Sequence, residues 1–188
     1  MVSMKARYNY QYDISDAELD SYASMEDDRV IAKLQEKLQP CVGVDSELEK
    51  LSKEGNYNLA VVSSSALRRI LVSIHKVGHS KYFQSHEIFS AADSLEKPSP
   101  KPDPAIYLHA METLGKVPVE CVAVEDSRSG ATSAYRAGIK TIGYTGCYED
   151  EEEKLRMRDV LMGAGCVVIM DDWKDFRACI QKIGTCGN

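Results

Sequence analysis

Apolar and polar residues alternate in blocks along most of the chain. From Val42 onward, short runs of apolar and β-branched residues are separated by stretches in which apolar residues recur every three or four positions. The short runs are typical of strands buried on both faces, and the longer stretches are typical of amphipathic helices. The predicted strands are NLAVVS (58–63), HEIFSA (86–91), CVAVED (121–126), KTIGYT (140–145) and CVVIM (166–170).

Helices are predicted on either side of these strands. Strands that alternate regularly with helices indicate an α/β fold, in which helices cover both faces of a parallel sheet. Ligands of such sheets bind beyond the carboxyl ends of the strands, so the chemistry is expected there. The predicted helices are VDSELEKLSKEG (44–55), SALRRILVSIHKVG (65–78), DPAIYLHAMETLG (103–115), SGATSAYRAG (129–138), EEKLRMRDVLMGAG (152–165) and DWKDFRACIQKIG (172–184).

Residues 14–40 have a less regular apolar pattern than the chain from Val42 onward. Residues 14–40 begin with Ser15 and Glu18 in the spacing of a capping box and end at Pro40. Their apolar stripe is loose, which predicts one long helix or two short ones.

The composition narrows the class of protein. The chain has 188 residues, of which 44% are hydrophobic and 28% are charged, as in a single globular domain. A net charge of −6 argues against nucleic acid or an anionic membrane as the main partner. The chain shows neither an apolar run of transmembrane length nor a signal-peptide core. Six cysteines without a CxxC pair are interpreted as reduced thiols, several of them buried, and the expected location is cytoplasmic.

Polar side chains follow three of the predicted strands. Ser63, Ser64 and Ser65 lead into a helix start that favours anions, Lys101 lies between two prolines that stiffen its loop, and Glu125 and Asp126 end a strand as paired carboxylates. Carboxylate oxygens suit Mg²⁺. The sequence therefore predicts a site for phosphate and magnesium at one edge of the sheet.

Other metal and nucleotide sites fit the sequence less well. His75, His79 and His86 have a spacing that could serve a metal, but there is neither an HExxH motif nor a cysteine partner at suitable spacing. The glycine patterns of dinucleotide-binding and P-loop proteins are absent.

From Pro40 to about Gly146 the sequence resembles the haloacid dehalogenase-like phosphatases, in the subgroup related to β-phosphoglucomutase and sugar-phosphate phosphatases. LAVVSSS, KPDPAIYLHA and VAVEDSRSGATSAYRAGI are similar to the second, third and fourth motifs of that family. The resemblance implies that Ser63 binds phosphate and that Lys101 steadies the phosphoryl group as a catalytic residue. It also implies that Asp126 binds Mg²⁺, with Glu125 in support.

The first motif of that family is missing from this sequence. The family's motif is a strand that ends in Asp-x-Asp-Gly and supplies the attacking carboxylate, and no two aspartates here are two positions apart. Asp171 and Asp172 are the other acids at a strand end and are interpreted as solvated. The resemblance implies a remnant of the helical cap over 1–40 and a Rossmann-like core over 41–188 that lacks its first strand.

Two functions follow from this pattern. The first is a Mg²⁺-dependent phosphatase of small phosphomonoesters such as sugar phosphates, shortened and inactive alone, with weak Mg²⁺ binding. The alternative is a non-catalytic protein that binds phosphate and metal in a regulatory or assembly role. The missing strand would lie between 60–62 and 122–124, so either these strands pair directly or another segment fills the slot. That segment would come from residues 1–12 or, by strand exchange, from a second copy in a homo-oligomer.

Overall fold

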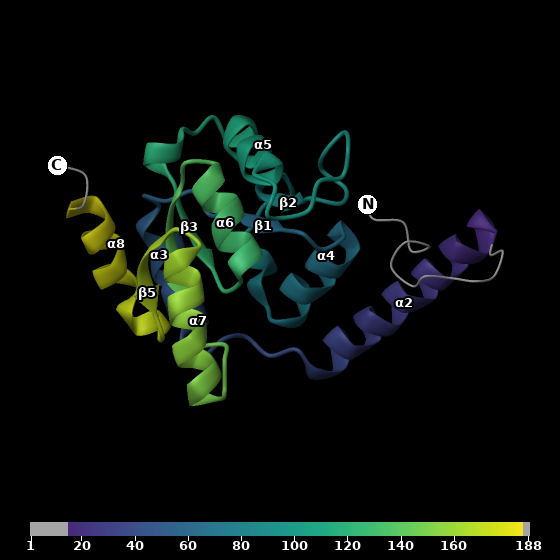
Figure 1. Ribbon diagram of the computed structural model, residues 1–188, viewed down its shortest axis with the longest axis horizontal. Helices are drawn as coiled ribbons and strands as arrows, with labels where there is room; N and C mark the ends of the chain where they lie inside the picture. The colour runs from purple at the N-terminus through teal and green to yellow at the C-terminus, as the bar shows by residue number, and fades with distance from the viewer. Residues whose placement is uncertain (1–14, 186–188) are drawn as a thin grey trace.

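The computed structural model describes residues 15–185, and Figure 1 shows its α/β architecture. All five predicted strands form, and each lies within its predicted range. The strands are β1 (Val61–Ser63), β2 (Ile88–Ser90), β3 (Val122–Glu125), β4 (Lys140–Tyr144) and β5 (Cys166–Met170). The helices are α2 (Asp16–Lys37), α3 (Val44–Glu54), α4 (Leu67–Lys76), α5 (Ala105–Leu114), α6 (Arg128–Arg136), α7 (Glu151–Gly163) and α8 (Phe176–Thr185). Short 3₁₀ turns occur at η1 (His79–Lys81), η2 (Ser85–Glu87), η3 (Pro118–Glu120) and η4 (Trp173–Asp175).

The strands are parallel, as predicted, but they form two sheets. β1 pairs with β2, and β4 lies between β3 and β5 in a separate sheet. β1 and β3 do not pair, so the expectation that the two strands slide together is wrong. Strand exchange with a second copy stays a prediction, and residues 1–12 lie outside the described part of the chain.

β1 and β3, which lie on either side of the break between the two sheets, are less covered than β2 and β4, the strands they pair with. Every residue of β1 is half-buried, and Val122 of β3 is 38% exposed. Every residue of β2 is buried, and so are four of the five residues of β4. An apolar strand inside a parallel sheet is normally covered on both faces and along both edges. The break therefore leaves apolar side chains of β1 and β3 incompletely covered.

Helices cover both faces of the sheets, as expected. On one face, α5 and α6 pack over β2 and β3 around Phe89, Ile106 and Ala123, and α7 packs beside α6. On the other face, α3 and α8 cover Ile142 of β4, and α4 covers Ile88 of β2. This arrangement brings the carboxyl ends of β1 and β3 to one side of the molecule.

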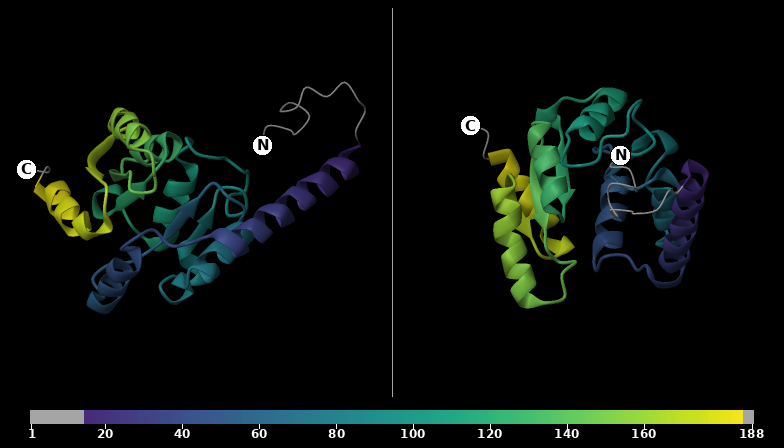
Figure 2. Two further views of the ribbon diagram at one scale, coloured as in Figure 1. Left: turned by 90° about the horizontal axis from the view of Figure 1, so that it is seen from below. Right: turned by 45° about the vertical axis from the view of Figure 1, so that its right-hand side comes forward.

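The predicted N-terminal helix is a single one, α2, which Figure 2 shows lying along α4. The capping box of Ser15 and Glu18 forms as predicted. Asp27 and Asp28 pair with arginines of α4, and Ile31 is buried. Among residues 15–185, no helix has the length and apolar composition needed to span a bilayer.

A buried carboxylate holds α8 against α3. Glu47 is only 2% exposed, and its Oε1 accepts a 2.5 Å hydrogen bond from Nε of Arg177. Arg177→Met would leave Glu47 with the 3.3 Å contact to Lys50 alone, so this substitution is expected to lower the free energy of unfolding clearly. Arg156→Met, which breaks an exposed pair with Glu153, should change it by less than about 1 kcal/mol. Urea titrations followed by circular dichroism measure both; equal effects would contradict the prediction.

Candidate functional site

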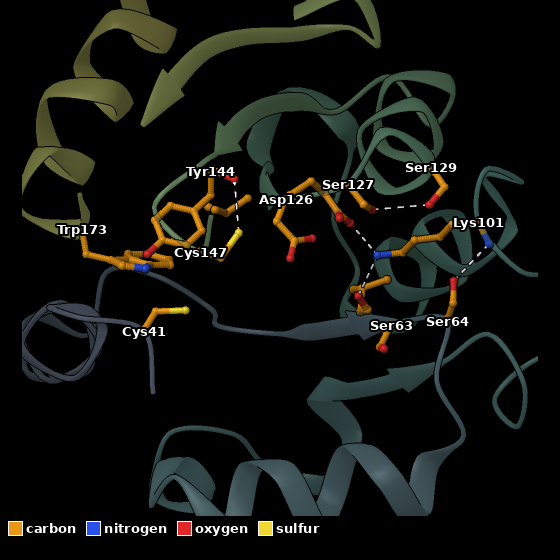
Figure 3. A pocket seen from close by; sticks show the side chains of 13 residues that line it. Cys41, Ser63, Ser64, Lys101, Asp126, Ser127, Ser129, Tyr144, Cys147 and Trp173 are labelled. Atoms are coloured by element: carbon orange, nitrogen blue, oxygen red, sulfur yellow. Dashed lines mark hydrogen bonds and ion pairs between the residues drawn. The ribbon is translucent and has the colours of Figure 1, made fainter. Parts of the chain in front are cut away.

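A pocket of about 460 Å³ opens at the carboxyl ends of β1 and β3, and Figure 3 shows the side chains around it. Five of the six predicted site residues line it: Ser63, Ser64, Lys101, Glu125 and Asp126. They come from the end of β1, from the loop between β2 and α5, and from the end of β3. The remaining lining residues are Cys41, Val62, Val124, Ser127, Ser129, Tyr144, Cys147 and Trp173.

The serines after β1 differ in their positions. Oγ of Ser63 accepts a hydrogen bond from the backbone N–H of Ser65 at 3.1 Å, which leaves its O–H free to donate to a ligand. Oγ of Ser64 accepts from the backbone N–H of Lys101 at 3.2 Å and so links the two loops. Ser65 is exposed and does not line the pocket.

The carboxylate of Asp93 already binds the N-terminus of α4. Oδ2 of Asp93 accepts hydrogen bonds from the backbone N–H of Leu67 at 2.6 Å and from the hydroxyl of Ser90 at 2.9 Å. The favourable field of a helix N-terminus acts over its first turn. Since Asp93 already occupies that turn, a bound anion would depend on the side chains of the pocket rather than on the helix start expected from the sequence.

Lys101 spans the break between the two sheets. Its side chain is 8% exposed, and its Nζ donates to the carbonyl oxygen of Val62 in β1 at 2.8 Å and to Oε1 of Glu125 in β3 at 2.5 Å. An ammonium group has three hydrogens to donate. Two are used by these contacts, and one is left for a ligand in the pocket.

The carboxylate of Glu125 is bound by two side chains and packs against a helix. Besides Lys101, the hydroxyl of Tyr107 in α5 donates to its Oε1. Its Oε2 lies so close to Gly130 in α6 that a Cβ at that glycine would be 1.8 Å away. Burial raises the pKa of Tyr107, and the charge of Glu125 adds to this effect, so the hydroxyl stays protonated and donates. Tyr107 is not among the residues predicted from the sequence, because its position on the predicted helix belongs to the apolar stripe.

Asp126 is the freer of the two carboxylates. It is exposed at the pocket, and among residues 15–185 no hydrogen-bond donor is bound to its side chain. Its backbone carbonyl accepts from the hydroxyl of Tyr148 at 2.8 Å, which holds the loop after β3. Burial raises the pKa of the neighbouring Cys147 thiol, and the charge of Asp126 raises it further.

The described residues do not form a complete magnesium site by themselves. Mg²⁺ requires near-octahedral coordination by oxygen, and the pocket offers one unbound carboxylate, that of Asp126, since Oε1 of Glu125 already accepts two hydrogen bonds. No cluster of three or more His, Cys, Asp or Glu side chains within 15–185 is arranged to hold a metal. His79, one of the histidines considered above as metal ligands, is bound to Asp45 at 2.5 Å.

The far wall of the pocket is aromatic and sulfur-rich. The rings of Tyr144 and Trp173 lie 5.5 Å apart, and the thiols of Cys41 and Cys147 are both exposed rather than buried. Asp171, interpreted as solvated, instead accepts hydrogen bonds from Thr145 and Arg158 and does not line the pocket.

Comparison with known proteins gives several matches. The chain is 36% identical over 107 residues to the phosphorylated carbohydrates phosphatase of Thermotoga maritima, which covers 57% of this chain and 47% of that protein. It is 35% identical over 103 residues to the phosphoglycolate phosphatase of Psychrobacter arcticus, covering 53% and 41%. The chain thus spans less than half the length of these relatives.

The fold and a family comparison agree with these matches. A haloacid dehalogenase-like protein from Agrobacterium tumefaciens has a similar structure, with a TM-score of 0.73 and 27% identity over 97% of this chain and 76% of that one. Residues 5–144, about three quarters of the chain, match the family described as haloacid dehalogenase-like hydrolase. On this match, the chain belongs to the haloacid dehalogenase-like hydrolases.

Proposed function

We propose that the pocket binds the phosphate group of a small phosphomonoester such as a sugar phosphate. The observation that carries this proposal is the buried ammonium of Lys101, which keeps one hydrogen free beside the hydroxyls of Ser63 and Ser64. Hydrogen bonds from a charged donor to phosphate oxygens are stronger than neutral ones. The names of the relatives, which are phosphatases of phosphorylated carbohydrates and of phosphoglycolate, support this class of substrate.

The proposed site also binds Mg²⁺. Asp126 lines the same pocket as Lys101, so its carboxylate would repel a bound phosphate unless a cation lay between them. We propose that Asp126 holds Mg²⁺ weakly through one carboxylate oxygen, with water as most of the other ligands. The ion would neutralise charge that develops on the phosphoryl oxygens.

The proposed role of the chain's own residues is to bind and orient rather than to attack. The acids that line the pocket are Glu125, which is bound by Lys101 and Tyr107, and Asp126, which is proposed to hold Mg²⁺. Covalent phosphoryl transfer needs a nucleophile that is free to approach phosphorus. We therefore propose that the described residues bind phosphate and Mg²⁺ without turnover of their own.

Calorimetry with inorganic phosphate and Mg²⁺ tests the binding. Ser63→Ala removes a donor to a charged ligand and is expected to weaken phosphate binding roughly tenfold. Ser52→Ala, on the exposed side of α3, serves as the matched control and should bind as the wild type does. A wild-type chain that binds no phosphate would refute the proposed function.

A phosphatase assay on sugar and aryl phosphates tests turnover, and none is expected. Binding without turnover would favour a non-catalytic role for the chain by itself. Mg²⁺-dependent turnover that Asp126→Ala abolishes would contradict the prediction and would require an attacking group that the described residues do not provide.

A further inference from the structure

Tyr107, in the first turn of α5, contacts both members of the Lys101–Glu125 ion pair. Its hydroxyl donates to Oε1 of Glu125, and Nζ of Lys101 lies 4.8 Å from the centre of its ring. A cation at this distance from an aromatic face is attracted by the ring. Tyr107 is buried and does not line the pocket, so its effect on a ligand must pass through the ion pair.

The carboxylate between these groups has little freedom to turn. Both donors, the ammonium of Lys101 and the hydroxyl of Tyr107, are bound to the same oxygen, Oε1. The other oxygen, Oε2, packs against Gly130, the third residue of α6. Because the donors fix one side and the helix blocks the other, the carboxylate is held in one orientation.

This orientation determines where the ammonium lies. Lys101 comes from a loop, and its side chain reaches the pocket past the ring of Tyr107 to bind Val62 and Glu125. A long side chain anchored only by an ion pair has considerable rotamer freedom, and fixing it has an entropic cost. The ring of Tyr107 and the fixed carboxylate of Glu125 restrict the rotamers of Lys101 in the free protein. A ligand therefore does not have to immobilise this side chain when it binds.

We propose that Tyr107 is a positioning residue of this pocket, which holds the ammonium of Lys101 in place for an anionic ligand through the carboxylate of Glu125 and through its own ring. The identity of the anion as phosphate rests on the proposed function. The positioning itself rests on the contacts of Tyr107 with Lys101 and Glu125.

Two substitutions separate the two contacts. Tyr107→Phe keeps the ring and removes the hydroxyl, whereas Tyr107→Leu removes both. The readout is the NMR signal of the Lys101 ε-methylene protons, which are inequivalent when the side chain is fixed and are shifted by a nearby ring. We expect Tyr107→Phe to average the two protons while part of the ring shift remains, and Tyr107→Leu to abolish both features.

Phosphate affinity provides the second readout. Loss of one hydrogen bond to the charged pair is expected to weaken inorganic phosphate binding roughly tenfold in Tyr107→Phe. The matched control is Tyr135→Phe, because Tyr135 is exposed on α6 and does not line the pocket. Incorporation of 4-aminophenylalanine at position 107 restores an N–H donor on the same ring and should return both readouts toward the wild type, also if Tyr107→Phe folds poorly.

The two readouts distinguish two kinds of failure. Lys101 signals that are the same in the wild type, in Tyr107→Phe and in the 4-aminophenylalanine variant would overturn the positioning role. A wild-type chain that binds no phosphate would refute the proposed function, and the Lys101 signals would still decide whether Tyr107 fixes the ammonium.

Discussion

Replacement of Lys101 by methionine is expected to lower the free energy of unfolding by about 3–5 kcal/mol, because it leaves a buried charge without its partner. The carboxylate of Glu125 is 8% exposed and would keep only the hydroxyl of Tyr107 as a charge-stabilising donor. The carbonyl oxygen of Val62 would lose its hydrogen bond to Nζ as well. The methionine side chain fills most of the volume of the lysine side chain, so the loss of stability comes from the unpaired charge rather than from poorer packing.

Denaturant titrations of Lys101→Met measure this loss, and calorimetry should find that phosphate binding is abolished. Lys97→Met is the matched control, since Lys97 is exposed in the same loop and its replacement should change stability by less than about 0.5 kcal/mol. In a double-mutant cycle, adding Glu125→Gln to Lys101→Met should restore part of the stability, because no charge then remains buried alone. A Lys101→Met protein as stable as the control would show that the carboxylate reaches solvent.

Gly130→Ala is expected to destabilise the protein, although alanine is the better helix former. In a helix interior, alanine is favoured over glycine by about 1 kcal/mol. At this position the added Cβ would lie 1.8 Å from Oε2 and 2.3 Å from Cδ of Glu125, and the carboxylate is held by Lys101 and Tyr107. Overpacking of a fixed site costs about 1–3 kcal/mol. Because a 1.8 Å approach places the cost at the upper end of this range, we expect a cost of about 3 kcal/mol and, after the gain from alanine, a net loss of about 2 kcal/mol.

Gly163 offers a control of the same chemical change. It is the last residue of α7, and a Cβ there would meet no heavy atom within 4 Å. Gly163→Ala should therefore leave stability unchanged or raise it by up to about 1 kcal/mol. Thermal melts of the two variants measure the difference. Equal melting temperatures for Gly130→Ala and Gly163→Ala would mean that Glu125 can move away from α6.

Hydrophobic periodicity predicted the elements of this fold well but not their pairing. The strand predicted over 58–63 is reduced to Val61–Ser63, because β1 pairs with β2 over three residues. A local pattern of apolar residues shows that a segment can be a strand, but the length of the strand depends on its partners. The same limit explains why one sheet was predicted where the chain forms two.

The site could be predicted in part, for a similar reason. Ser63 ends β1, Asp126 follows β3 directly and Lys101 lies in the loop after β2, and the carboxyl ends of parallel strands meet at one edge. Tyr107 could not be found in this way. It lies within a helix among core residues, and its partner Glu125 is 18 positions further along the chain in a different element, so no periodicity within one element connects them.

The break between β1 and β3 has a consequence for how the molecule opens. Among residues 15–185, no backbone ladder joins the sheet of β1 and β2 to the sheet of β3, β4 and β5. Side chains link them instead: Lys101 is bound to Val62 and to Glu125 near the pocket, and α5 and α6 share one apolar core over β2 and β3. Opening between these two units therefore breaks side-chain contacts but no strand pairing. An anion held by Ser63 in one sheet and by Lys101 beside the other would act as a reversible cross-link, so occupancy of the pocket would set how far the two units unfold together.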